Sequence, residues 1–129
     1  MSPLDSRQRD LVKCEDMRIH AERAQQFVGS CSYAEFLDDD MVQAAVIRCV
    51  EVIGEAARQV SEDTRRRAPA IPWLLIIGLR NILAHDYGAV DLERVYGVVT
   101  ENLPELLVHL GSLIATLEQE VGWTTDDEA

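Results

Sequence analysis

The chain has 129 residues, of which 47% are hydrophobic and only 5% aromatic, and its formal net charge is -11. This length fits one domain with a single core, and the apolar content excludes a disordered chain. Because nucleic-acid coating depends on neutralising phosphates, the acidic balance argues against a broad RNA-binding surface. A local phosphate site is still compatible with it, since every cation except Lys13 is an arginine, the better residue for bidentate phosphate contacts.

Cysteine usage and the apolar runs limit where the protein acts. Cys14, Cys31 and Cys49 are odd in number and show no CxxC spacing, so we expect free thiols in a reducing cytosol rather than disulfides or a metal site. Polar residues follow Met1 directly, so no signal peptide is expected. The longest apolar run, IPWLLIIGL, is about half a membrane span. We therefore expect a cytoplasmic protein with no membrane association, no metal and no cofactor.

The N-terminal third of the chain shows clear helical spacing. Apolar residues recur at steps of three and four from Leu11 to Val28 and predict a long helix that ends near Gly29. The sequence SYAE at 32–35 is a capping box, in which a hydroxyl and a carboxylate satisfy the first backbone amides of a helix. We therefore expect a short helical turn after it.

A second long helix is predicted from Asp40 to about Ser61, and it is apolar over most of its circumference. Such a helix belongs in the centre of a bundle or at a subunit interface. Gly54 lies in its middle at a cost of roughly 1 kcal/mol relative to Ala, which indicates that a neighbouring backbone packs close to it. The polar exceptions recur on one stripe and are Arg48, Glu51, Glu55 and Arg58.

Two prolines in RRRAPAIP, residues 65–72, then break the helical pattern. Pro72 is well placed as the first residue of a third helix, which is predicted to run to about Asp86 and to end at a Gly88 cap. Trp73 is expected to be a packing anchor. The arginines at 65–67 have two interpretations: they contact the RNA backbone of a substrate, or they complete the C-terminus of a helix.

The last third of the chain is also helical in pattern. Asp91 is expected to cap a fourth helix, and Pro104 kinks that helix or divides it from a fifth. No segment shows convincing strand alternation. The predicted fold is therefore all-α, an up-and-down bundle of four to five helices. One domain is expected over residues 1–123, followed by an acidic tail at 124–129.

The stretch GLRNILAHDYGAVD, residues 78–91, places several polar side chains in an otherwise apolar run. On an ideal helix, Arg80 and Tyr87 lie about 20° apart in azimuth and about 10 Å apart along the axis, whereas His85 lies about 140° round from Arg80. These side chains cannot form one compact site on a single rigid helix. Either the helix loosens near His85, or a second subunit helps the groups to converge.

Each of these residues also has an ordinary structural interpretation. A histidine near a helix C-terminus complements the helix dipole, as His85 does on this view. An arginine in an apolar helix usually pairs with a carboxylate, and Tyr87 fits a half-buried packing position. His20 and His109 stand without partner motifs, and we expect both to be structural.

Taken together, the residues follow the pattern R-x(4)-H-x-Y on the third helix of a small bundle, and the chain resembles the HEPN superfamily. More narrowly, it resembles the HepT-type ribonuclease toxins, which are paired with a minimal nucleotidyltransferase antitoxin. The resemblance covers most of the chain from residue 40 to residue 110. It rests on four segments in the family's order, which are VEVIGEAARQV at 50–60, APAIPW at 68–73, GLRNILAHDYGAVD at 78–91 and LPELL at 103–107.

This resemblance implies a metal-independent endoribonuclease toxin, working as a homodimer, with Arg80 and His85 as its catalytic pair. The chemistry is consistent with that pair. Attack by the RNA 2′-hydroxyl needs a group that moves protons near neutral pH, and histidine is suited to it. The charge that develops on phosphorus needs a permanent cation, which an arginine supplies.

Three further residues of the motif have roles that the resemblance or the chemistry suggests. Asn81 can support the pair by donating hydrogen bonds to phosphate. Asp86 stands where many relatives have a small residue, and it either orients His85 or weakens RNA binding through its charge. Tyr87 matches the tyrosine to which the partner nucleotidyltransferase attaches AMP in this family, and a bulky anionic group there would block and repel RNA.

Two questions stay open at this point. Glu51 and Glu55 either reach Arg80 across the helix pair and orient it, or they belong to a solvent-facing stripe paired with arginines of their own helix. The chain is alternatively a non-catalytic helical module that docks a nucleotidyltransferase or binds nucleotide. The intact pair of Arg80 and His85 favours the ribonuclease, whereas the net charge of -11 favours the module.

Overall fold

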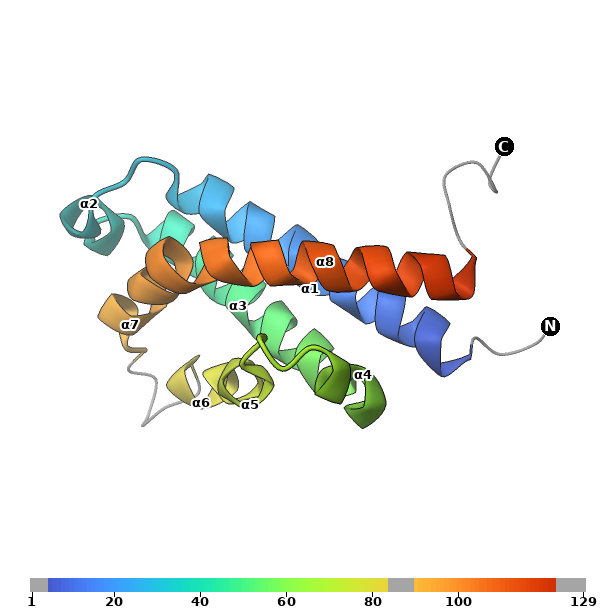
Figure 1. Cartoon of the computed structure of the whole chain (residues 1–129). Coiled ribbons are helices and arrows are strands. Elements are labelled where there is room, and N and C mark those ends of the chain that lie inside the picture. The colour runs from blue at the N-terminus through green and yellow to red at the C-terminus, as the bar shows by residue number, and fades with distance from the viewer. Residues whose placement is uncertain (1–4, 84–89, 123–129) are drawn as a thin grey trace.

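The regular structure of the described residues is helical throughout, as Figure 1 shows for a computed structural model of the chain. The structure describes residues 5–83 and 90–122. Three helices are long: α1 (Ser6–Val28), α3 (Asp40–Gln59) and α8 (Leu103–Val121). The shorter elements are α2 (Tyr33–Leu37), α4 (Glu62–Arg67), α5 (Trp73–Ile77), α6 (Leu79–Leu83), α7 (Leu92–Gly97) and the π-helical turn η1 (Val98–Asn102). The all-α prediction is confirmed.

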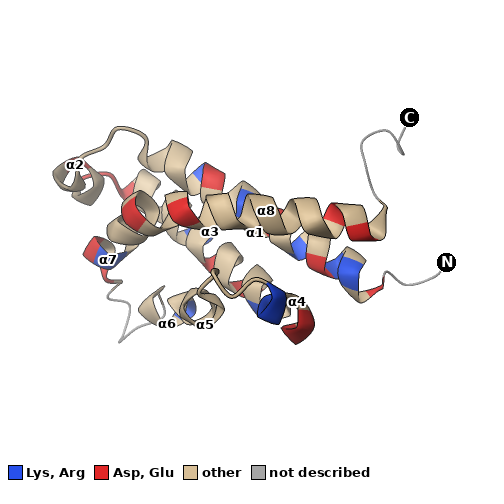
Figure 2. Ribbon diagram, in the orientation of Figure 1, with Lys and Arg blue, Asp and Glu red and all other residues tan. Residues whose placement is uncertain are grey.

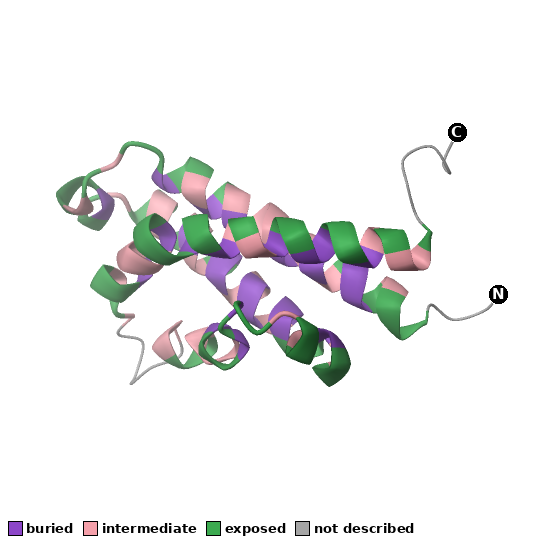
Figure 3. Ribbon diagram, viewed as in Figure 1, coloured by how far each residue is buried: buried purple, intermediate pink, exposed green. Residues whose placement is uncertain are grey.

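The core lies where α1 packs against α3 and α8 (Figure 1). On α1, the side chains of Met17, Ala21 and Ala24 are fully buried, and the alanines allow the neighbouring helices to approach closely. Figure 3 shows that each long helix buries the face turned toward its neighbours and exposes the opposite one. Because α3 packs against α1 on one side and against α5 and α6 on another, its apolar circumference is explained mainly within one chain.

The helix starts follow the capping residues that the sequence predicts. Ser32 accepts a hydrogen bond from the backbone amide of Glu35, whose carboxylate accepts one from the amide of Ser32, so the predicted capping box is confirmed. Asp91 caps α7 in the same way, with its carboxylate 3.1 Å from the amide of Arg94. Pro104 lies in the first turn of α8, directly after η1. Because Gly97, Asn102 and Leu103 all have right-handed helical backbone angles, α7, η1 and α8 form one helical run that is irregular at η1 and is not divided at Pro104.

The prediction of one continuous third helix is wrong over the residues that the structure describes. It begins at Trp73, with Pro72 as the preceding cap, and it is interrupted at Gly78 between α5 and α6. The physical reason is that the amide of Asn81 bonds to the carbonyl of Gly78, three residues back, which tightens the turn beyond α-helical geometry. The predicted end at Asp86 and the Gly88 cap lie outside the described residues.

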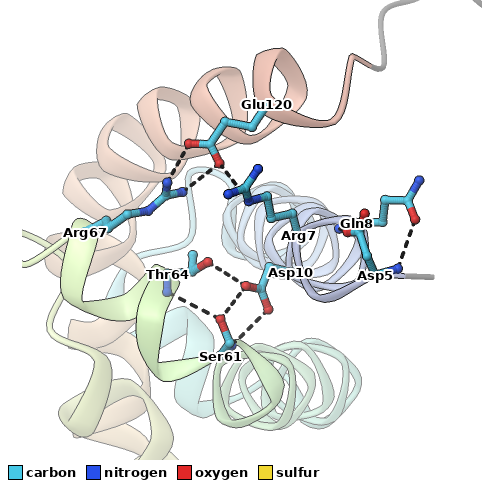
Figure 4. Close-up of polar contacts among 8 residues, drawn as sticks. All are labelled: Asp5, Arg7, Gln8, Asp10, Ser61, Thr64, Arg67 and Glu120. Carbon is cyan, nitrogen blue, oxygen red and sulfur yellow. Dashed lines mark hydrogen bonds and ion pairs between the residues drawn. The ribbon is translucent and has the colours of Figure 1, made fainter. Parts of the chain in front are cut away.

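The second helix ends earlier than predicted, because Ser61 leaves it and caps the short helix α4 instead. Figure 4 shows how α4 is held. The buried carboxylate of Asp10 on α1 accepts hydrogen bonds from the amide and hydroxyl of Ser61, at 2.9 and 2.6 Å, and from the hydroxyl of Thr64. Arg67 forms a bidentate pair with Glu120 on α8. The first contact ties α4 to α1, and the second ties it to α8.

Two of the three arginines in the last turn of α4, Arg65 and Arg67, have partners within the fold. Arg67 is engaged by Glu120, and the Nε of Arg65 donates to the carbonyl of Val60 at 3.0 Å. Trp73 is buried, and its Nε1 donates to the carbonyl of Ala68 at 3.0 Å, which confirms it as a packing anchor. Among the described helices, none is both long and apolar enough to cross a membrane.

Candidate functional site

The first polar residue of the predicted catalytic motif, Arg80, lies on α6 at the edge of an open groove. Its side chain is 59% exposed, and its Nη1 lies 3.6 Å from the Oε2 of Glu55 on α3. The groove has a volume of about 580 Å³ and is bounded by α1, α3 and α6. Its lining includes the charged residues Lys13, Asp16, Arg48, Glu51, Glu55 and Arg80.

Gly54 explains how α5 and α6 come so near to α3. A Cβ at position 54 would lie 3.1 Å from the carbonyl oxygen of Ile76 and 3.7 Å from the Cγ of Arg80. The first distance is tighter than side chains normally tolerate, so glycine allows the backbone of α5 to pass directly over α3. The prediction of a close backbone approach at Gly54 is confirmed, and that approach is what brings Arg80 beside Glu55.

Glu55 is the acidic partner of Arg80, and it is also held from its own helix. Arg58 donates to it at 2.6 and 3.3 Å, and Gln59 donates at 3.0 Å. These hydrogen bonds, from Arg58 first and Gln59 second, with a smaller effect of the nearby Arg80 charge, lower the pKa of Glu55 to about 2. The carboxylate is thus charged at neutral pH and fixed in place on the side that faces α6.

Pairing within the helix holds for both glutamates of the α3 stripe, because Glu55 also pairs with Arg58 at 2.6 Å, and the contact with Arg80 holds for one of them. Glu55 reaches Arg80, whereas Glu51 pairs with Arg48 on its own helix at 3.5 Å. Lys13 and Asp16 of α1 line the same groove, and sequence reasoning missed both. No spacing or motif could have found them, because their proximity to Arg80 arises only when α1 packs on α3.

Asn81 does not join Arg80, although the two are adjacent in the sequence. Asn81 lines a different and larger groove, on the side of α6 that faces α7, η1 and the start of α8. His85, Asp86 and Tyr87 lie outside the described residues, so the pairing of Arg80 with His85 stays a prediction. Leu83, at the end of α6, lines the same groove as Arg80.

The remaining histidines have structural surroundings. The Nδ1 of His20 lies 2.9 Å from the carbonyl of Asp16, one turn earlier on α1. The Nε2 of His109 lies 3.7 Å from Glu105 on α8. Among the described residues, no three histidine, cysteine or acidic side chains come together as a metal site.

Comparison with known proteins identifies the family. A family model described as ribonuclease HepT-like matches residues 17–113, which include α3, α6 and Arg80. The chain belongs to the ribonuclease HepT-like family. This assignment confirms the HepT-like resemblance and the prediction of an endoribonuclease.

Individual relatives support the same family. A protein of Methanocaldococcus jannaschii named as an RNase is 40% identical over 81 residues, which cover 63% of this chain and 74% of the relative. A protein of Thermococcus cleftensis named as a ribonuclease HepT is 36% identical over 92 residues, covering 71% of this chain and 84% of the relative. No solved structure matches the chain significantly.

Proposed function

We propose that this HepT-like protein cleaves RNA through attack of a 2′-hydroxyl on the adjacent phosphorus, with Arg80 and His85 as the catalytic pair. The observation that carries the proposal is the placement of Arg80: a 59% exposed guanidinium at the edge of an open groove, backed by Glu55. A guanidinium in that position can bind a phosphate by two parallel hydrogen bonds. His85 takes the proton from the attacking hydroxyl and returns one to the leaving oxygen.

The contact between Arg80 and Glu55 is suited to exchange for a substrate. At 3.6 Å, with both side chains substantially exposed, it is a weak ion pair that solvent screens. An incoming phosphate can therefore displace it without a large loss, while the carboxylate keeps the guanidinium aimed at the groove before RNA arrives. The negative charge that develops on the phosphorane is then stabilised by a cation that is already in position.

The cellular role extends this proposal. We infer a cytoplasmic toxin, with Asn81 and Asp86 supporting the catalytic pair, that is silenced when a minimal nucleotidyltransferase antitoxin transfers AMP to Tyr87. The free thiols of Cys14, Cys31 and Cys49 fit a reducing compartment. On this proposal RNA cleavage needs no metal or cofactor, whereas the partner transfers AMP from ATP to the Tyr87 hydroxyl and releases pyrophosphate.

A homodimer is also part of the proposal. The support now comes from exposed apolar side chains rather than from the whole circumference of α3, most of which is covered within the chain. Met41 at the start of α3 is 81% exposed, and Phe27 and Leu37, at the ends of α1 and α2, are about half as exposed. The end of α1, the short helix α2 and the start of α3, which carry these residues, lie at one end of the bundle (Figure 1).

The test is RNA cleavage by the purified protein in EDTA, with analysis of the product ends. The wild-type protein should release 2′,3′-cyclic phosphate ends, and His85→Ala and Arg80→Ala should release none while their helical circular dichroism stays unchanged. Cleavage by both variants at the wild-type rate would exclude Arg80 and His85 as the catalytic pair. Cleavage that stops in EDTA and returns with a divalent ion would contradict the metal-independent mechanism.

One alternative keeps some support. The net charge of -11, with acidic and basic residues interspersed over the helices in Figure 2, favours a non-catalytic module that docks a nucleotidyltransferase. The same cleavage assay separates the two functions, because a docking module would leave RNA intact in every buffer.

A further inference from the structure

A second and larger groove lies on the opposite side of α6 from Glu55. It has a volume of about 1240 Å³ and runs between α5 and α6 on one side and α7, η1 and the start of α8 on the other. None of the residues that pair with Arg80 line it. Asn81 is the proposed supporting residue that lines it, and the rest of its described lining has no part in the proposed reaction.

The groove carries an apolar surface that the fold leaves open. Leu74 and Leu75 on α5 both line it and are 80% and 72% exposed. Pro72, Leu79 and Ile82 extend this apolar lining along the same segment. Two neighbouring leucines exposed to this extent in a concave site are typical of a surface that another chain covers.

The rim of the groove is acidic. Asp91 and Glu93 line it from the start of α7, and Glu101 and Glu105 line it from η1 and α8, and all four are exposed. Arg94 is the one arginine or lysine among the described residues that line the groove. Figure 2 shows the acidic positions on α7 and on the helix that leads into α8.

This charge decides between the possible occupants. RNA would place its phosphates against four carboxylates, which is unfavourable. A second copy of the chain in two-fold symmetry would bring the same acidic rim against itself, and like charges in contact suppress such a pairing. A segment whose apolar side chains are flanked by lysine or arginine would bury the two leucines and pair with the carboxylates of the rim.

We propose that this groove docks a protein partner through an amphipathic segment, apolar on one face and basic at its edges. Leu74 and Leu75 contact the apolar face, and the four carboxylates pair with the basic edges. This is the helix-in-groove mode, in which apolar anchors supply affinity and peripheral charges supply specificity and association rate. The inference goes beyond RNA cleavage and does not depend on it.

The experiment measures binding of a synthetic amphipathic helix of leucine and lysine to the full chain, beside a matched helix with glutamate in place of lysine. The leucine–lysine helix should bind and should shift the backbone NMR signals of α5, α7 and η1, whereas the glutamate helix should not. Leu74→Ser with Leu75→Ser should weaken binding by about tenfold or more. Glu101→Gln with Glu105→Gln should weaken it by about three- to tenfold at low salt.

Matched controls lie elsewhere on the surface. Val108→Ser removes an exposed apolar side chain on α8 that does not line the groove. Glu62→Gln with Asp63→Asn removes two exposed carboxylates from the first turn of α4. Both should bind the helix like the wild type. Equal binding of the glutamate helix, or equal loss in these controls, would overturn the proposal. So would leucine variants that convert a dimer to a monomer, or an RNA oligonucleotide that shifts the groove signals.

Discussion

At the scale of single residues, Glu55 is the described acidic side chain that pairs with Arg80. It reaches the guanidinium across the helix pair while Arg58 and Gln59 hold its carboxylate from behind. Glu51 provides a natural comparison, because it lines the same groove from the same helix but pairs with Arg48. Of the two glutamates that line the groove, Glu55 therefore contacts Arg80 and Glu51 does not.

Glu55→Gln should lower kcat for RNA cleavage by about two- to fivefold, the range expected for loss of an exposed ion pair. KM should stay the same or fall, because a negative charge has left the groove. Glu51→Gln should leave kcat within error. A rise in KM with unchanged kcat in Glu55→Gln would show that the carboxylate contributes to RNA binding instead of orienting Arg80.

The pH dependence follows from the lowered pKa of Glu55, about 2. A depressed carboxyl pKa stabilises the folded state above the unfolded value, and this contribution is lost only as the pH falls toward the folded value. Glu55 therefore stays ionised across the range in which an imidazole titrates. The acid limb of the cleavage-rate profile should be the same in the wild type and in Glu55→Gln, and a shifted limb would assign that titration to Glu55.

Tyr87 carries the proposed regulation. With a partner nucleotidyltransferase and ATP, the intact mass should rise by one or more adenylyl groups and cleavage should fall, since the modification adds bulk and negative charge. Tyr87→Phe lacks the acceptor hydroxyl, so it should remain active and resist silencing. AMP found on another residue, or inhibition without any AMP, would leave simple occlusion by the partner as the explanation.

At the scale of elements, the site depends on the crossing of α5 and α6 over α3 at Gly54. In Gly54→Ala, the added methyl group would meet the Ile76 carbonyl at 3.1 Å, so α5 must move by a few tenths of an ångström. We expect a lower Tm and slower cleavage. Gly111→Ala on α8 is the matched control, because a Cβ there meets nothing within 4 Å, and it should stabilise the helix by about 0.5–1 kcal/mol. Equal behaviour of the two variants would contradict the role of this crossing.

The helices and their starts could be predicted from the sequence because they depend on local signals. Apolar spacing defines α1, and the side chains of Ser32 and Asp91 cap their own helices within three residues. Even the close approach at Gly54 was predictable, since a mid-helix glycine is costly without a reason in packing. The interruption at Gly78 was not, because the pattern of apolar residues continues through it.

Contacts between distant segments could not be predicted in the same way. Asp10 meets Ser61 and Thr64 only after α1 has packed on α3, and this contact ties α4 to α1. Likewise, the sequence offers two glutamates for Arg80, and only the packed structure selects Glu55. Asn81 follows Arg80 directly, yet it lines another groove because successive helical residues point in different directions.

At the scale of the whole molecule, the proposed dimer should be visible in sedimentation at micromolar concentration. Met41→Ser should weaken it, because this apolar side chain is 81% exposed at the start of α3. Val12→Ser, at a less exposed apolar position on α1, should not. A clean monomer that still cleaves RNA would show that the catalytic site is complete within one chain.

The central claim is that Arg80 in its groove is the cation that cleaves RNA, and the most direct measurement compares it with Arg58. Both arginines contact Glu55, but only Arg80 lines the groove. Single-turnover cleavage of one labelled RNA should slow by about a hundredfold or more in Arg80→Ala, as expected when a group that stabilises developing charge is lost. Arg58→Ala should stay within about fivefold of the wild type. A wild-type rate in Arg80→Ala, or equal losses in the two variants, would contradict the claim.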